Sequence, residues 1–479
     1  MKKKLLSLLV MLCMAFSICL VGCGDKGLGD NPATDATVIS NGGMSVIKGD
    51  YLYFVNGYVD ETTLTKDDNK EGKITKGAIY RTKLDDGEIV KDRDGFLDDD
   101  RTDRVVSKIV GFSNGGFSII DDNIYYATPY MKLDKDGNLQ NNRVEFHRVN
   151  IDGTDDEVVY VTSASQDNLN WSLYKIDGKV YLVVYESDKI ISVNTSNGKT
   201  VGTVESPSSF AILDEDTYIH GANRSGYNYN NIIYTRAIDA SDNVYNYKGN
   251  AVCSFNIATG EKTTLSLSQT DTISIMHVTG DTVYYTKVDS TLTGDIACLY
   301  KKVMTTTWNG SQETQLTNLN YDAYYFVGYG NDLIVATRDD ATWRLEGDAN
   351  NGPTKILSAK RDVLGIYGRY GYYVVEGDLI RFDINSYDKL EEVCGDLTTL
   401  ISTSNYLDCD NRRIYTYGMY TAENGDTNYY LTYFEENCTP ETFDQRFVGV
   451  FEDGDLPAKP EQPEPEFEGD EVEYVPHID

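Results

Sequence analysis

Short runs of alternating apolar and polar residues recur along the chain, and an acidic or glycine-containing turn joins each pair of runs. Within each pair, Gly-Asp, Asp-Asn or Asp-Gly supplies the turn-tolerant positions of a tight hairpin. The flanking Ile, Val and Tyr suit a pleated, half-buried surface. The pattern therefore predicts β-hairpins over residues 45–54, 118–126, 173–182 and 276–285.

Each hairpin is followed by further strand-like runs. A third run ends in glycine, as over 77–87, 145–153 and 252–260, and a fourth run rich in Thr and Ser follows, as over 261–267. Four short antiparallel strands in roughly 40–60 residues are typical of one blade of a β-propeller. Stacked β-sandwiches are the alternative. We favour the propeller because the units resemble one another and no Pro/Ser-rich linker separates them.

The number of blades follows from the number of units. Eight candidate units begin near Gly43, Gly116, Asn168, Phe210, Thr272, Tyr321, Val363 and Ile401. The sixth unit keeps its hairpin but has weak later strands, so seven blades is the alternative count. The segment 35–40 resembles 107–112, and we expect it to pair with the final blade and protect the open edges of the ring. The predicted fold class is all-β, a single β-propeller of four-stranded antiparallel blades over residues 34–451, closed by an N-terminal strand.

The first 22 residues have the features of a signal peptide, because Lys2-Lys3-Lys4 precede an apolar run from Leu5 to Val21. A transmembrane anchor is the alternative, since the run approaches spanning length. Leu20-Val21-Gly22-Cys23 resembles the bacterial lipoprotein lipobox at all four positions. This resemblance implies cleavage before Cys23 and lipid attachment to its thiol, which would anchor the protein to the outer face of the cell membrane. Residues 23–33 would form a flexible tether.

The C-terminal residues 452–479 contain 11 acidic residues, five prolines and a single lysine, Lys459. We expect a disordered, solvating tail. The whole chain has a formal net charge of −33. This charge argues against nucleic acid as a partner, because nucleic acid requires a basic face. It also argues against electrostatic docking on anionic lipid.

Two acidic loops could bind calcium. The loop of the first unit supplies the candidate metal ligands Asp92, Asp94, Asp98 and Asp100, with a solvated loop as the alternative. The segment 134–138 opens like a calcium loop, but Leu139 stands where the sharp-turn glycine belongs. We therefore predict a hairpin turn there. No other cofactor is expected.

Cysteine and histidine show no catalytic or disulfide pattern. Cys253 and Cys298 fall at equivalent third-strand positions of successive units. Face-packed sheets lie about 10 Å apart, whereas a disulfide needs α-carbons within about 7 Å, so we predict two buried thiols. We find no HExxH, GxSxG, phosphate-binding loop or sialidase aspartate box. Enzymatic activity is therefore not expected.

Tyrosine is abundant, with 37 residues. Many lie in the second strand of a hairpin, where we expect them to pack between blades. An Asn-rich insertion in the fourth unit carries the candidate ligand contacts Tyr227, Tyr229, Tyr234, Tyr245 and Tyr247. Tyr and Asn together make adaptable polar contact surfaces in binding proteins. A plain surface hairpin is the alternative.

The repeated phrase of Tyr-Tyr, then Leu/Ile-Tyr-Arg ending in Asp-Gly, resembles the propeller domains of unknown function in clostridial cell-surface proteins. Those domains are distantly similar to the YWTD propellers of the lipoprotein-receptor family. The likeness covers residues 35–451, although Val283-Tyr284-Tyr285-Thr286-Lys287 replaces the full Tyr-Trp-Thr-Asp. It implies a propeller fold and a Gram-positive, exported setting, but those propellers have no settled activity that could be carried over to this chain.

These observations favour a monomeric, non-enzymatic binding or scaffolding propeller. Its expected partner is an extracellular protein, peptide or glycan. The alternative is an extracellular carbohydrate-active enzyme, a glycoside hydrolase or lyase, because a fold does not fix a function. A glycoside hydrolase would require two carboxylates roughly 5–10 Å apart.

Overall fold

The computed structural model describes residues 44–451 with gaps. The gaps are 61–63, 66–73, 93–95, 111–115, 141–142, 163–169, 187, 212–229, 243–248, 269–270, 280–281, 289–295, 305–307, 310–311, 328–332, 347–351, 364, 368, 377, 395–405, 409–412, 423–424, 436–437 and 440–445. The described part consists of β-strands and two 3₁₀ helices, Asp99–Arg101 (η2) and Ala240–Asp242 (η3). No helix within it has the length and apolar character needed to cross a membrane.

The strands form eight sheets in chain order. The first four sheets contain Ser45–Lys48 (β1), Tyr51–Val55 (β2), Ile79–Asp85 (β3), Glu88–Ile89 (β4) and Thr102–Val106 (β5); Phe117–Ile120 (β6), Asn123–Pro129 (β7), Val144–Asn150 (β8) and Glu157–Val161 (β9); Asn170–Ile176 (β10), Lys179–Glu186 (β11), Lys189–Asn194 (β12) and Lys199–Glu205 (β13); and Ser209–Phe210 (β14), Asn231–Ala237 (β15), Asn250–Asn256 (β16) and Lys262–Ser268 (β17).

The remaining sheets contain Thr272–Thr279 (β18), Thr282–Val288 (β19), Ala297–Val303 (β20) and Glu313–Gln315 (β21); Ala323–Val327 (β22), Leu333–Arg338 (β23), Ala341–Glu346 (β24) and Thr354–Leu357 (β25); Gly365–Tyr367 (β26), Tyr370–Val375 (β27), Asp378–Asp383 (β28) and Leu390–Cys394 (β29); and Tyr406–Asp408 (β30), Arg413–Thr421 (β31), Thr427–Glu435 (β32) and Arg446–Val448 (β33).

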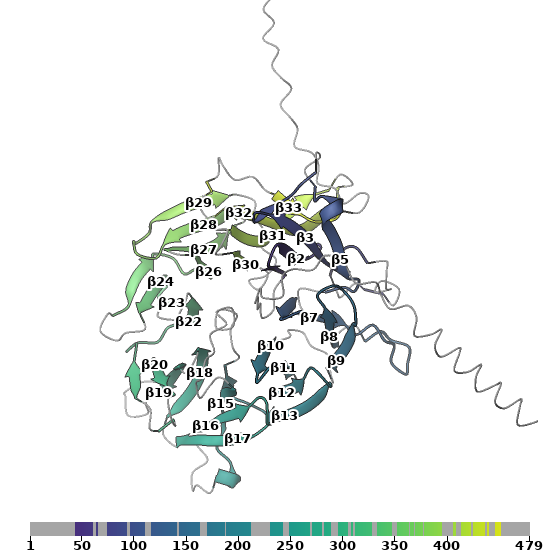
Figure 1. Cartoon of the computed structure of the whole chain (residues 1–479). Helices are drawn as coiled ribbons and strands as arrows, with labels where there is room; N and C mark the ends of the chain where they lie inside the picture. Colours follow the sequence, from purple (N-terminus) through teal and green to yellow (C-terminus); the bar gives the residue numbers. More distant parts are fainter. Residues whose placement is uncertain are drawn as a thin grey trace, which may run out of the picture.

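The eight sheets stand around a ring, each built from one continuous stretch of chain (Figure 1). All their strand pairs are antiparallel, so the fold is an eight-bladed β-propeller, as predicted. In the first blade β3 pairs with both β4 and β5, which makes this sheet five-stranded. The sixth blade has its full set of four strands, β22 to β25. The alternative of seven blades is therefore wrong.

The hairpin turns have the backbone that the sequence predicts. Asp177 and Gly178 both have positive φ, 49° and 72°, and so do Asp86 and Gly87, at 51° and 81°. Asp tolerates the left-handed region better than most residues, and Gly enters it without a steric penalty. These pairs therefore allow a tight reversal between neighbouring strands.

In the turn between the third and fourth strands of a blade, a glycine packs closely on the preceding blade. A Cβ atom at Gly153 would lie 2.7 Å from the Val105 carbonyl oxygen of the first blade. The same construction gives 3.0 Å between Gly198 and Val159, and 2.6 Å between Gly260 and Val201. All three glycines have positive φ. The glycine that ends the repeated phrase is thus required for the close approach of adjacent blades.

The hydrophobic core is divided among the interfaces between blades. Ile232 and Tyr234 of β15 pack with residues of the third blade, whereas Ile233 packs with residues of the fifth. Successive side chains of a strand point to opposite faces of its sheet. Because both faces of a blade are covered, the second strands read as nearly continuous apolar runs, and their tyrosines are buried there, as predicted.

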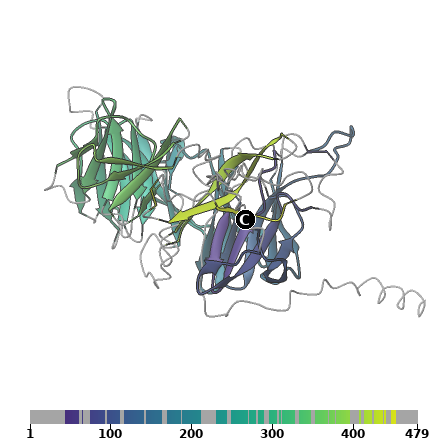
Figure 2. The same cartoon turned by 90° about the horizontal axis from the view of Figure 1, so that it is seen from above.

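The ring closes where the eighth blade meets the first. Asn56, which is fully buried, donates to the Val450 carbonyl at 2.8 Å and accepts from its N–H at 2.9 Å. The Tyr58 N–H donates to the Tyr429 carbonyl at 2.9 Å, and Tyr417 donates to the Val55 carbonyl. Both views place the last strands (yellow) beside the first (purple) (Figure 2). The predicted closing strand 35–40 lies outside the described residues, as do Cys23 and the two terminal segments.

Candidate functional site

The fourth blade carries the insertion in which the sequence predicts ligand contacts. Within the described residues this prediction can be followed at Tyr234, which lies on β15, is 3% exposed and pairs across the sheet with Cys253. Burial raises the pKa of its hydroxyl. Tyr234 is therefore a core residue of the blade rather than a surface contact. The other four candidates, Tyr227, Tyr229, Tyr245 and Tyr247, lie outside the described residues.

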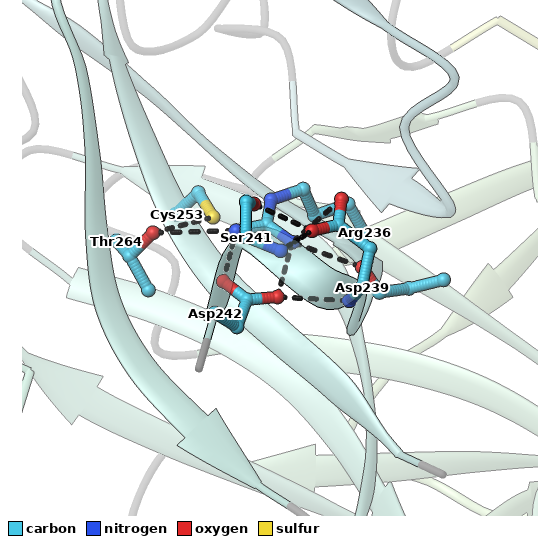
Figure 3. Close-up of polar contacts among 7 residues, drawn as sticks. Arg236, Asp239, Ser241, Asp242, Cys253 and Thr264 are labelled. Carbon is cyan, nitrogen blue, oxygen red and sulfur yellow. Dashed lines mark hydrogen bonds and ion pairs between the residues drawn. The ribbon is translucent and has the colours of Figure 1, made fainter. Parts of the chain in front are cut away.

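An ion pair fixes the chain that leaves β15 (Figure 3). Arg236 donates two hydrogen bonds to Asp242, one of 2.8 Å from Nη1 to Oδ2 and one of 2.6 Å from Nη2 to Oδ1. Asp239 accepts from the Ser241 N–H at 2.8 Å, and its own N–H donates to Asp242 at 2.9 Å. Bidentate pairing of arginine with a carboxylate restricts geometry as well as adding energy. These contacts hold η3 at the start of the segment 243–248.

The electrostatics of this ion pair favour its charged form. The hydrogen bonds from Arg236 hold the pKa of Asp242 at about 2, and Asp242 in turn raises the pKa of Arg236. Thr264 Oγ1 lies 3.4 Å from Arg236 Nη2 and 3.9 Å from Cys253 Sγ. Burial raises the pKa of the Cys253 thiol. Because the thiolate is the reactive form, this cysteine is an inert part of the core.

The other end of the same segment is fixed by an amide. Asn250 opens β16, is 6% exposed and donates a hydrogen bond of 2.5 Å to the Ile273 carbonyl of the fifth blade. Its Oδ1 accepts from the Ile273 N–H at 3.2 Å. Nearby, Ser209 Oγ accepts from the Ile275 N–H at 2.9 Å and lies 2.6 Å from Thr235 Oγ1. The described residues on both sides of 243–248 are thus held by specific hydrogen bonds.

A second polar cluster lies in the second blade, and the sequence did not predict it. His147 on β8 is 3% exposed and lies parallel to the Tyr126 ring, with 5.0 Å between ring centres. Its Nδ1 is 2.7 Å from Asp156 Oδ1, and its Nε2 is 3.8 Å from Glu145 Oε1. Lys108, from the connection between the first and second blades, donates to Asp156 Oδ2 at 2.9 Å. The sequence does carry one sign of this cluster. The phrase Phe146-His147-Arg148 has histidine where the repeated phrase Leu/Ile-Tyr-Arg has tyrosine.

The fifth blade holds a related cluster without histidine. Tyr285 stacks on Tyr300, with 5.8 Å between ring centres, and its hydroxyl donates to Glu313. Lys287 donates to the same carboxylate at 2.6 Å. Lys302 donates to the Trp308 carbonyl at 3.1 Å, and burial lowers the pKa of its amine. These residues satisfy one another inside the blade.

The acidic loop of the first blade gives no defined metal site in the residues that can be described. Asp92 accepts from the Phe96 N–H at 2.9 Å, and Asp98 accepts from the Asp100 N–H at 3.0 Å and caps η2. Asp94 lies outside the described residues. No group of three or more His, Cys, Asp or Glu side chains in the described ranges is arranged to hold a metal ion. Calcium at this loop therefore stays a prediction.

The second acidic loop is a turn, as predicted. Asp134 accepts from the N–H groups of Asp136 and Asn138, both at 2.8 Å. Leu133 and Leu139 pair as an isolated antiparallel bridge across this turn. The Asp134 carboxylate is thus used to close the turn.

The described cysteines are free. Cys253, Cys298 and Cys438 are buried and unbonded to sulfur, which confirms the prediction of two buried thiols on β16 and β20. Their positions are not equivalent, however. Cys253 pairs across the sheet with Tyr234 in the fourth blade. In the fifth blade the corresponding tyrosine, Tyr285, pairs with Tyr300, and Cys298 lies two residues earlier on that strand and pairs with Lys287.

Comparisons with known proteins add little to the fold. No protein-family model and no curated protein matches the chain. Among solved structures, a eukaryotic initiation factor aligns over 89% of this chain and 90% of its own, with 13% identity and a TM-score of 0.44. A prolyl endopeptidase aligns over 84% of this chain at 8% identity and a TM-score of 0.41, and the alignment spans about half of its length, 55%. The β-propeller domain of the Trilobed protease from Pyrococcus furiosus aligns over 75% and 93% of the two chains, with 9% identity and a TM-score of 0.34. Likeness of this degree carries no functional information.

Proposed function

We propose that the chain is a cell-surface lipoprotein whose propeller binds or scaffolds an extracellular protein, peptide or glycan without catalysing a reaction. Cys23 would carry the lipid anchor. The binding segment would be the Tyr- and Asn-rich insertion of the fourth blade, including Tyr245 and Tyr247. The observation that carries the proposal is the pair of clamps, Arg236–Asp242 and Asn250–Ile273, at the two ends of residues 243–248.

Clamped ends favour binding because they reduce the entropy that a loop loses when it engages a partner. Tyrosine adds a large contact area and has only two side-chain torsions to restrict. The insertion therefore combines fixed residues at its two ends, Asp242 and Asn250, with the side chains most often found at binding hot spots. The remaining candidates of the same blade, Tyr227 and Tyr229, would extend this surface.

The described carboxyl groups whose pKa is clearly shifted are stabilised in their charged form. Among the described carboxyl groups, every pKa that departs clearly from its ordinary value is lowered, by hydrogen bonds or nearby cations that outweigh burial where burial opposes them. These groups are Asp134, Glu145, Asp156, Asp239, Asp242, Glu313, Asp383 and Asp388. The general acid of a glycoside hydrolase requires the opposite shift.

The test replaces both loop tyrosines. Wild type and a Tyr245→Ser/Tyr247→Ser variant are compared on a glycan array and in quantitative cross-linking to intact cells of the source organism. We expect the variant to lose at least about tenfold in binding to each ligand that the wild type retains, because tyrosines at an interface are frequent hot spots. The matched control is Tyr387→Ser in the seventh blade, since Tyr387 is 57% exposed and lies outside the insertion.

Equal binding by wild type and the double variant would reject the fourth-blade surface. Hydrolysis or elimination of any glycan on the array by the wild type would instead support the enzyme alternative. Thermal melting of all three proteins shows whether a loss of binding reflects a loss of folding.

A further inference from the structure

The His147 cluster brings four ionisable groups from three segments into contact. Glu145 and His147 come from β8, Asp156 from the turn before β9, and Lys108 from the connection between the first and second blades. The Tyr126 hydroxyl, from β7, also donates to Asp156 Oδ2 at 2.8 Å. The side chain of Lys108 is 29% exposed and that of Asp156 26%, so solvent reaches one side of the cluster.

The charge of the cluster depends on the imidazole ring. When His147 is protonated, both ring nitrogens carry a hydrogen and each faces a carboxylate, Asp156 at 2.7 Å and Glu145 at 3.8 Å. Two cations then balance two anions, although Lys108 Nζ lies 3.3 Å from Nδ1 and opposes protonation of the ring. When His147 is neutral, one ring nitrogen presents a lone pair. If Nδ1 keeps its hydrogen for Asp156, the lone pair on Nε2 faces Glu145, and the cluster has an excess negative charge.

We propose that this cluster is a pH-responsive joint between the first two blades, in which protonated His147 holds Asp156 and, with it, the turn 153–156 that packs on Val105 of the first blade. Loss of the proton weakens the hold on this turn. Histidine is the residue suited to this role because its charge changes near neutral pH. The joint acts within the ring, so it is independent of the ligand proposed above.

The shifts in pKa agree with this direction. Burial and the Lys108 ammonium would lower the pKa of His147, but Asp156 and Glu145 outweigh both, and the pKa lies above its ordinary value. Burial would raise the pKa of Asp156, but His147 and Lys108 hold it at about 2. The close histidine lowers the pKa of Glu145, with smaller contributions from Lys132 and Lys108. Over the neutral range both carboxylates therefore stay charged, and the ring is the group that changes.

The sign of the effect follows from linkage. A histidine whose pKa is raised by folding stabilises the folded state fully below the pKa of the unfolded chain. That contribution disappears as the pH rises through the folded-state pKa. Asp156 and Glu145 act in the opposite sense, because their contribution is lost in acid. The joint is therefore strongest in mildly acidic solution.

Two measurements on the full chain test the proposal. The first is a ¹⁵N NMR titration of the histidine rings, with His147 assigned from a His147→Gln variant. The second is hydrogen exchange, corrected for the intrinsic effect of pH, over 153–158. We expect hydrogen-exchange protection of these amides to fall between pH 6 and pH 9, about tenfold for each unit by which folding raises the pKa of His147. His147→Gln should remove this dependence.

Matched variants separate the joint from a general effect of losing a histidine. His277→Gln serves as the control, because His277 is 6% exposed and stacks on Phe326, with 4.6 Å between ring centres, in another part of the ring. This variant should keep the wild-type pH dependence, and Asp156→Asn should lower the pKa of His147. A ring that titrates at or below its ordinary pKa, or a pH dependence that persists in His147→Gln, would overturn the proposal. If His147→Gln fails to fold, His147 is assigned by elimination from His220→Gln, His277→Gln and His477→Gln, and the wild-type titration then decides.

Discussion

In the second blade Tyr126 stacks on His147, and in the fifth blade Tyr285 stacks on Tyr300 at the corresponding cross-strand position. The angles between ring planes are nearly the same, 16° and 15°. In both blades the hydroxyl of the first tyrosine donates to a carboxylate that also accepts from a lysine. The repeat thus preserves a ring pair and a carboxylate while the third-strand residue changes.

That one change decides how each blade responds to pH. Tyrosine is neutral throughout the physiological range, and burial together with Glu313 raises the pKa of Tyr285 further. The fifth-blade cluster therefore keeps one charge state where the second-blade cluster changes. A difference at one repeat position can thus give one blade of a propeller a response to pH that another blade lacks.

The largest effect is expected from the turn that places Asp156. Gly153→Ala would put a Cβ atom 2.7 Å from the Val105 carbonyl at a φ of +82°. Left-handed backbone and an overpacked interface together should cost about 3 kcal/mol of unfolding free energy, measured by urea denaturation. The control is Gly178→Ala, where φ is +72° and nothing lies within 4 Å.

Gly178→Ala should cost only about 1 kcal/mol, since strain in φ is its main penalty. If the two variants lose equal stability, close packing of the turn on the preceding blade is not what requires glycine at position 153. The corresponding turn of the fifth blade lies partly outside the described residues, so this test addresses the second blade alone.

The next effect should be shared by the two blades. Tyr126→Phe and Tyr285→Phe keep the ring stack and remove one hydrogen bond to a carboxylate, Asp156 or Glu313. Loss of a hydrogen bond to a charged group should cost about 1.5 kcal/mol in each case, read from denaturation midpoints. A cost in one blade without a cost in the other would show that the clusters are not equivalent.

The acid limb of stability should also be common to both blades. Asp156, with a pKa of about 2, and Glu313, with a lowered pKa, each stabilise the fold above their unfolded-state pKa. This contribution is lost as the pH falls from about 4 towards 2. Asp156→Asn and Glu313→Gln should each make the unfolding free energy less dependent on pH in that range, measured by urea denaturation at several pH values. Unchanged slopes in both variants would refute the common acid response.

The repeat made the architecture predictable because its signals are local. Asp-Gly turns and alternating strands placed the first unit near Gly43 and the last near Ile401, against observed first strands that begin at Ser45 and Tyr406. The prediction was weakest in the sixth unit, where Asp339 and Asp340, with φ of 51° and 57°, make a tight turn without glycine. Two aspartates in the left-handed region joined strands that the sequence pattern had not separated clearly.

The second-blade cluster could not be predicted in the same way, because its residues meet through packing between blades. Lys108 and His147 are 39 residues apart in sequence. Their contact depends on the close approach of the second blade's turn to β5, which no local pattern reports. The two hydrogen-bonded pairs of the fourth blade, Arg236–Asp242 and Asn250–Ile273, are intermediate in predictability between the local turns and the second-blade cluster. Arg236 and Asp242 are six residues apart in sequence, whereas Asn250 reaches Ile273 of the next blade.

The smallest effect is expected from an exposed ion pair of the second blade. Arg148 donates to Glu157 at 2.6 Å, and their side chains are 26% and 60% exposed. Glu157→Gln should change the unfolding free energy by less than about 0.5 kcal/mol, and salt should reduce the change further. Asp156→Asn changes the adjacent residue but removes the carboxylate nearest to buried His147, so its cost should be clearly larger. If urea denaturation gives equal costs for the two variants, burial does not distinguish the His147 cluster from an ordinary surface pair, and the contrast with the fifth blade loses its energetic basis.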